Sequence, residues 1–440
     1  MKKVATVVGF VVVLVALVYG IVGMLASNAS SAIAKKWRTI ESDEAFAAKF
    51  PPVKAKNDVA TALEGAAMTL GIGMMPKPEL DALAEGSIDK AQFVRFKQAA
   101  DGWIQASVEA PDDSITAPPE EVSRYLEENR APIDMLLATL ERGDAPRWPV
   151  SFEGNSQSRP LPNLLGQMQL SRLLSAVSLS AKRAGDDARA WRAQGAAWTL
   201  AKGMLSRPEM ISQLIGVALV RGIAGVSRKL EGPTPAWFGE VERFDFHRSM
   251  LDSCRAEWNA SSEAVFGAGF VEQMRDAARA ESPHVGRIVR EVATRPFVQW
   301  GLTEMENVTV DELLKLQRAE PCDIDSRAIA ASIESRVPRI ARVIAGDFLP
   351  STHLAFSRVA MAKIAIEGTS KIVELKARRT ATADRAWPDQ ADDLATSSCS
   401  RTRWRYERNG DGSIRLVFEG KVDVPRGTQG YSIPTEYLAK

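Results

Sequence analysis

A run of apolar residues at 4–26 is the most pronounced hydrophobic pattern in the chain. It contains no charged side chain, and only Met1, Lys2 and Lys3 precede it. As a helix with a rise of 1.5 Å per residue, this run would be about 34 Å long, enough to cross a hydrocarbon core of about 30 Å. We therefore expect a transmembrane anchor over residues 1–26.

The flanks of this run leave one alternative open and set the expected orientation. Ala32-Ile33-Ala34 has the small-x-small pattern of a cleavage site, so the alternative is a protein secreted after cleavage near Ala34. The run is longer than the roughly 7–15 apolar residues of a signal peptide, which favours a retained anchor. Lys2 and Lys3 lie closest to the run and predict a cytoplasmic N-terminus and a body on the other side of the membrane.

The remaining chain has the periodicity of helices separated by proline, glycine and aspartate. The strongest stripe of apolar residues lies at Leu165, Met168, Leu173 and Val177. Gly185-Asp186 then predicts a helix end followed by a new N-cap. The predicted organisation is a juxtamembrane stalk at 27–56, an N-terminal helical region at 57–144, a loop at 145–161, a main helical domain at 162–378 and a C-terminal segment at 379–440.

Helices of about 20 residues joined by short turns predict antiparallel neighbours. The fold class is therefore mainly α, either an antiparallel helical bundle or an irregular, repeat-like α-solenoid. The tetratricopeptide pattern is not present. Further helices are expected at 234–262, 268–280, 284–301, 309–318 and 326–376, the last broken near Pro338 and Leu349-Pro350.

The C-terminal segment has a different pattern. Residues 402–408 alternate between polar and apolar, with Trp404 and Tyr406 on one face. Asn409-Gly410-Asp411-Gly412 has the residues of a tight hairpin turn, and 414–419 reads as the returning strand. We expect a small β-hairpin followed by an extended tail.

The balance of charges argues against nucleic-acid binding, and the cysteine content leaves the disulfide pairing open. The chain has 56 basic and 55 acidic residues, and removing Lys2 and Lys3 leaves 54 and 55 for the body. This balance, without a dense basic patch, argues against nucleic-acid binding. Cys254, Cys322 and Cys399 permit three different single disulfides in an oxidising compartment, and no CxxC pattern selects among them.

Two short constellations are the candidates for catalytic chemistry. Asp245, His247 and Ser249 place a carboxylate, an imidazole and a hydroxyl within five residues, but neighbours on one helix seldom converge as a triad requires. Glu281 and His284 have the spacing of half a carboxylate di-iron site, which needs the motif twice. We therefore assign no catalytic residue, cofactor or metal, and interpret these residues first as polar helix faces and caps.

The order of anchor, helical body, Trp387-Pro388 and Tyr-containing hairpin resembles that of uncharacterised single-pass bacterial envelope proteins. The C-terminal tail is also similar to that of pseudopilins, although the chain lacks the Phe-Thr-Leu-Ile-Glu start of that family. This resemblance covers only the two ends of the chain and implies no function.

The expectation from the sequence is a bacterial inner-membrane protein with a periplasmic body. That body would bind other envelope proteins as a scaffold or assembly factor, and its anchor would contact membrane lipid. The alternative is an envelope hydrolase or carbohydrate-active enzyme with a site near Asp245, His247, Glu281 and His284.

Overall fold

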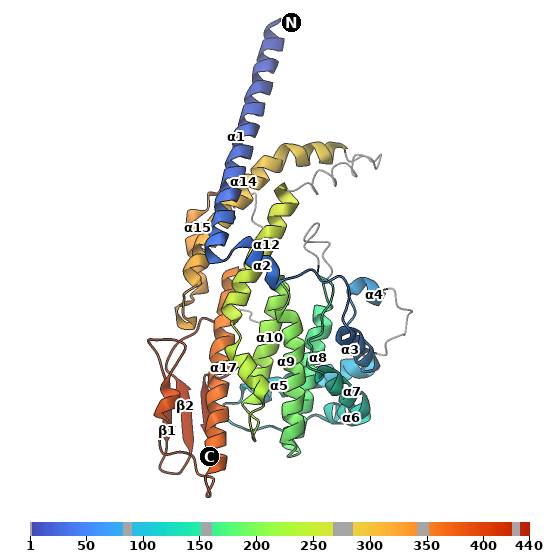
Figure 1. The fold of residues 1–440 in the computed structure, drawn as a ribbon, viewed down its shortest axis with the longest axis vertical. Coiled ribbons are helices and arrows are strands. Elements are labelled where there is room, and N and C mark those ends of the chain that lie inside the picture. Colours follow the sequence, from blue (N-terminus) through green and yellow to red (C-terminus); the bar gives the residue numbers. More distant parts are fainter. Residues whose placement is uncertain are drawn as a thin grey trace.

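The computed structural model describes residues 2–81, 90–150, 161–266, 285–339, 341, 352–424 and 432–440. These residues form a long N-terminal apolar helix, a mainly helical body and a small three-stranded antiparallel sheet near the C-terminus (Figure 1). The predicted mainly α fold with an apolar N-terminal helix and a C-terminal hairpin is confirmed at this level.

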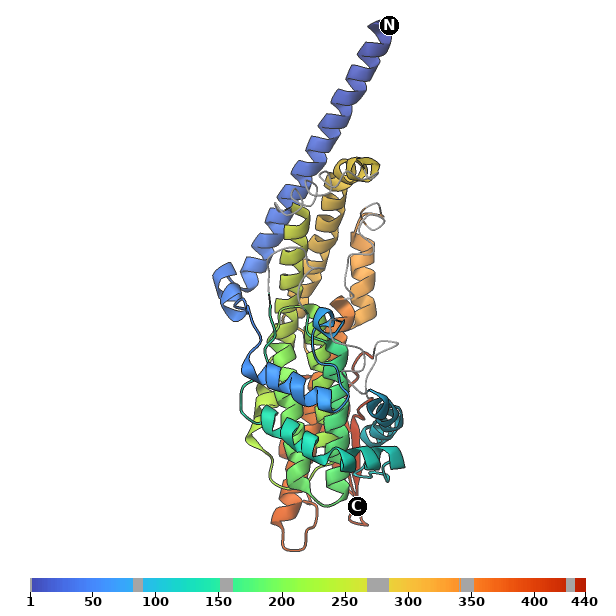
Figure 2. The same ribbon diagram turned by 90° about the vertical axis from the view of Figure 1, so that its right-hand side faces the viewer.

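Helix α1 (Lys2–Ile40) is uninterrupted and projects well beyond the body in both views (Figure 1, Figure 2). Apolar side chains at Val13 and Ile21 are exposed, whereas Ile33 and Trp37 are buried. Here α1 packs against helix α14 (Val285–Leu316). The segment predicted as a polar stalk, 27–56, therefore begins as the inner part of the same helix that carries the apolar run.

The segment after α1 is also held against the body. Ser42 caps helix α2 (Asp43–Lys49) by accepting a hydrogen bond from the Ala45 amide. Phe46 and Phe50 then pack with Ala256 of helix α12 (Phe246–Phe266). Five further helices follow: α3 (Asp58–Thr69), α4 (Lys77–Asp81), α5 (Ala91–Glu109), α6 (Glu120–Glu128) and α7 (Arg130–Leu140).

Three successive helices form the centre of the body, as the sequence predicts: α8 (Leu164–Arg183), α9 (Asp187–Leu205) and α10 (Met210–Ser227). Asp186 accepts a hydrogen bond from the Arg189 amide and so caps α9. Gly185 has a φ of 79°, the left-handed conformation that favours glycine after a helix.

Helix α10 is mainly apolar, with Gln213 and Arg221 among its few polar side chains. It packs against α8, α9, α5, α12 and helix α17 (Thr352–Ala381). By length and composition it resembles a membrane span, but 78% of its length is buried inside the protein. It is therefore a core helix.

Two predicted boundaries differ from the structure. The sequence predicts one helix over 234–262, but the structure has α11 (Ala236–Arg243) and α12. The chain is extended at Phe244, and Asp245 starts the second helix by accepting a hydrogen bond from the Arg248 amide. Conversely, 284–301 and 309–318 are predicted as two helices but belong to the single helix α14, which accommodates Pro296. The predicted helix at 268–280 lies outside the described residues.

Shorter elements connect α14 to the C-terminal part of the chain. They are the 3₁₀ helices η2 (Pro321–Asp323) and η3 (Asp392–Ala395) and the helix α15 (Ser326–Arg336). Asp325 caps α15 by accepting hydrogen bonds from the Arg327 and Ala328 amides. These elements bring the segments around residues 320 and 398 close together beside α17.

The C-terminal sheet has the order β1-β2-β3. Strands β1 (Trp404–Arg408) and β2 (Ile414–Phe418) form the predicted hairpin, with Arg408 opposite Ile414. The third strand, β3 (Glu436–Ala439), pairs antiparallel with β2, in place of the predicted extended tail. Side chains from all three strands pack with α17 in a second, smaller core.

The main hydrophobic core is continuous. It includes side chains from α1, α3, α5, α7, the three central helices, α12, α14 and α17. Helices before and after the segment 145–161 thus share one core, although the sequence suggests this segment as a boundary between two helical regions.

The contact between α1 and α14 predicts a local effect of Trp37→Ala. Trp37 is 2% exposed, and removing a buried tryptophan side chain costs about 3–5 kcal/mol. We expect faster amide hydrogen exchange in residues 27–40 and in the adjoining part of α14, with little change in α8 and α9. Arg38→Ala, at an exposed position, is the control. Equal exchange in the two variants would contradict the proposed packing role of Trp37.

Candidate functional site

The residues predicted as candidates converge, in part, on a cleft beside α17. The cleft has a volume of about 460 Å³, within the usual range for ligand sites. It is formed by the α11–α12 junction, the end of α14, η2, the middle of α17 and Ser398. We call it the His247 cleft, because His247 and Asp245 both line it.

Asp245 has a structural role at this cleft. Its Oδ1 atom accepts a hydrogen bond from the Arg248 amide at 2.9 Å, which satisfies a free donor in the first turn of α12. Asp245 also attracts the protonated form of His247, but burial has the larger effect on that imidazole. The carboxylate is thus a helix cap with a modest electrostatic influence on the histidine.

His247 is held by packing against Phe356 and by a hydrogen bond to the backbone. Its ring lies 5.0 Å from the ring of Phe356 and donates a hydrogen bond to the backbone of Leu316. Burial lowers the pKa of His247 below its ordinary value, because the charged form loses hydration. The Nε2 atom is buried and has no partner among the described residues.

The three groups Asp245, His247 and Ser249 do not form a triad. Ser249 donates its hydroxyl hydrogen to Gln213 Oε1 at 2.7 Å. Ser398, which lines the cleft, donates to Glu367 Oε2 at 2.5 Å. A nucleophile must share its hydrogen bond with the base, and neither hydroxyl does so with His247. Among the described residues, His247 therefore has no serine hydroxyl as a hydrogen-bond partner.

Glu281 and His284, the other two candidate residues, lie outside the described residues. Among the residues that are described, no group of three or more His, Cys, Asp or Glu side chains is arranged to hold a metal ion.

Cations dominate the polar lining of the His247 cleft. Arg243, Arg318 and Lys363 contribute three positive charges. The acids are Asp245 and Glu320, and both already accept hydrogen bonds from the protein. Glu320 receives them from the Ser400 amide at 2.7 Å and its hydroxyl at 3.0 Å, which lowers the pKa of this carboxyl. The cleft is therefore suited to an acidic group of a binding partner.

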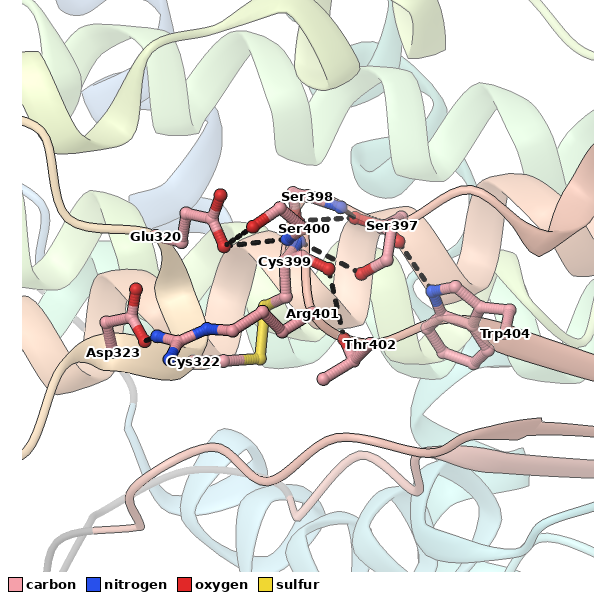
Figure 3. The surroundings of a disulfide bond; sticks show 11 residues. Glu320, Cys322, Asp323, Ser397, Ser398, Cys399, Ser400, Arg401, Thr402 and Trp404 are labelled. Carbon is pink, nitrogen blue, oxygen red and sulfur yellow. Dashed lines mark hydrogen bonds and ion pairs between the residues drawn. A yellow bond between two sulfur atoms is a disulfide. The ribbon is translucent and has the colours of Figure 1, made fainter.

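A disulfide fixes one wall of the cleft (Figure 3). Cys322 of η2 is bonded to Cys399, with 5.9 Å between their Cα atoms, and Cys254 is a free, buried thiol. The bond joins two segments 77 residues apart. Pro321 and Ser398, the neighbours of the two cysteines, both line the cleft.

The sequence indicates His247 and Asp245 as candidate site residues, but it does not indicate Lys363, Glu320 or Ser398, which also line the cleft. These residues come from α17, the end of α14 and the segment before β1, and each is unremarkable in its local sequence. The disulfide that gathers them joins cysteines too far apart for spacing to indicate a pair. Only the tertiary structure assembles this lining.

Comparison with protein-family models, with curated proteins and with solved structures gives no match. The interpretation of the cleft therefore depends on its own residues.

The buried imidazole predicts a contribution to pH-dependent stability. In the unfolded chain, His247 titrates near 6.5, and in the folded protein its pKa is lower. The unfolded state therefore takes up a proton first, and stability falls as pH drops below about 6.5 until the folded pKa is passed. We expect His247→Gln to lose less stability between pH 7.5 and 5 than the unmodified protein in denaturant unfolding.

His353, whose pKa is also lowered by burial, is present in both the unmodified protein and the His247→Gln variant. It therefore contributes equally to the pH dependence of stability in both. Parallel pH profiles for the two proteins would show that His247 titrates normally in the folded state.

Proposed function

We propose that this chain is a single-pass inner-membrane protein whose helical body lies in the periplasm and binds another envelope protein as a scaffold. The body, as an antiparallel bundle or an irregular α-solenoid, would present the His247 cleft to that partner. The continuity of α1 is the observation that carries this proposal.

Helix α1 is suited to two environments along its length. Val13, Leu17 and Met24 expose apolar side chains to the surroundings, as a helix in lipid would. Further along, Ala26, Ile33 and Trp37 are buried in the body, and Lys36 forms an ion pair with Asp311 of α14 at 2.5 Å. Because no flexible linker separates the two parts, the body is held at a defined distance from the bilayer.

The disulfide supports a periplasmic body. Stable disulfides form in oxidising compartments and are rare in the cytosol. Cys322 and Cys399 pair across 77 residues, and the remaining thiol, Cys254, is buried. This agrees with the orientation that Lys2 and Lys3 predict.

A binding role has more support than hydrolysis. In the described part of the His247 cleft, the Ser398 hydroxyl donates to Glu367, and Asp245 caps a helix. Arg243, Arg318 and Lys363 remain as cations that can meet an acidic surface of a protein. The lining of the cleft is therefore better suited to attract an acidic protein surface than to supply a catalytic base together with its nucleophile.

Reporter fusions after Lys440 test the topology. We expect alkaline phosphatase, which needs an oxidising compartment, to be active in this fusion, and a fluorescent protein that matures only in the cytoplasm to remain dark. The mass of the membrane-bound chain should correspond to an intact N-terminus. The reverse reporter pattern would refute the orientation, and a soluble product beginning after Ala34 would establish cleavage.

A site-specific photocrosslinker tests the binding surface. Placed at Arg318 on the rim of the His247 cleft, it should give a discrete protein adduct in cells. Met135 on α7 is 57% exposed and outside the cleft, so a crosslinker there is the matched control. Lys363→Glu should weaken the Arg318 adduct several-fold, because it reverses a charge in the lining. The same adducts from both positions, or none from Arg318, would contradict the proposal.

A further inference from the structure

A second cavity lies between helices α10 and α17 and the C-terminal sheet. It has a volume of about 350 Å³ and shares no lining residue with the His247 cleft. Arg221 and Arg228 line it from α10, Ile364 and Ile372 from α17, and Trp404 from β1. We call it the arginine pocket. The C-terminal sheet that contributes to its lining lies at the end of the body remote from the N-terminus of α1 (Figure 1).

One wall of the arginine pocket is an apolar stripe on α17. Met361, Ile364, Gly368 and Ile372 recur at spacings of three or four residues and so lie on one face of the helix. A Cβ atom at Gly368 would lie 2.6 Å from the ring of Trp404, so the glycine allows the indole to pack closely on α17. This wall suits an aliphatic group.

The opposite wall carries two buried cations. Arg221 and Arg228 are seven residues apart on α10, about 10 Å along one face, and are 5% and 1% exposed. Arg228 donates to the carbonyl oxygens of Pro434 at 2.8 Å and Glu436 at 2.7 Å, and its Nε has no partner among the described residues. Burial lowers the pKa of Arg228 to about 10, so it is still charged at pH 7.

The acids near the pocket are already engaged. Among the described lining residues, Glu436 is the only carboxylate, and it is paired with Arg415 at 2.5 Å. Asp113, behind Arg228, is held by Lys376 at 2.6 Å and by the Tyr437 hydroxyl at 2.7 Å.

Lys421 adds a further positive charge to the lining. Asp113 and Asp112 attract the charge of Arg228 from behind the pocket, but burial has the larger effect on its pKa. Burial and the nearby charge of Arg358 lower the pKa of Arg221. Arg221, Arg228 and Lys421 together give the lining a positive potential, which favours an anionic group.

We propose that the arginine pocket binds a small amphiphile with an acidic head group and an aliphatic body. The head group would lie between Arg221 and Arg228, and the aliphatic part would lie along the α17 stripe beneath Trp404. This ligand site is separate from the proposed protein-binding cleft, so either proposal can fail without the other.

Calorimetry on the full chain in nanodiscs tests this proposal, with octanoate as the probe and empty nanodiscs as the blank. Octanamide has the same chain without the charge, and acetate has the charge without the chain. We expect octanoate to bind at least tenfold more tightly than either, because only octanoate uses both walls. Equal heats for octanoate and octanamide, or for octanoate and acetate, would overturn the proposal.

Two variants locate the site. Arg221→Gln should raise the Kd for octanoate at least tenfold, and Met361→Trp, at a half-buried position, should do so by filling the end of the pocket. Arg403→Gln removes an exposed arginine of the same sheet region and should leave the Kd unchanged. Unchanged melting temperatures show that the variants are folded. A Kd within twofold of the original in both folded pocket variants would refute the assignment.

Discussion

The burial of most of α10 is the constraint around which the body is arranged. A mainly apolar helix is stable in water only when other elements cover it. Helices α5, α8, α9, α12 and α17 provide this cover. Close approach is possible because Gly216 lies against Leu205 and Gly225 against Val108, where a Cβ atom would clash at 2.7 and 2.3 Å.

The C-terminal end of α10 ties distant parts of the chain together through buried cations. Lys229 donates to the carbonyl of Ala110 at 2.8 Å and to that of Asp112, and Arg228 holds the segment before β3. Lys376 of α17 donates to the Arg228 carbonyl at 2.7 Å. Burial lowers the pKa of Lys229 to about 7, which reflects the cost of this arrangement. These bonds place the C-terminal sheet against α10 and α17, so the arginine pocket is a consequence of how the core helix ends.

The sequence predicts best where the signal is local. The cap at Asp186 and the turn at 409–412 depend on neighbouring residues, and the structure has the expected helix and hairpin there. Strand β3 could not be predicted, because four residues without strong alternation become a strand only when β2 is beside them. The same limit applies to the site. The identity of His247 is visible in the sequence, but its burial depends on Leu316 and Phe356, which α14 and α17 supply.

The proposed membrane anchor and the body share a single helix, which has consequences that a flexible tether would not have. A tethered enzyme acting on a diffusing substrate gains little from a fixed orientation, whereas a scaffold must present its surface at a reproducible height and angle. Here Ile33 and Trp37 fix α1 in the core, and α14, which holds α1, ends at the His247 cleft. The disulfide beside Pro321 holds the other wall of that cleft. The position of the cleft relative to α1 is thus determined by packed helices and a covalent bond, as the proposed role of an assembly factor would require.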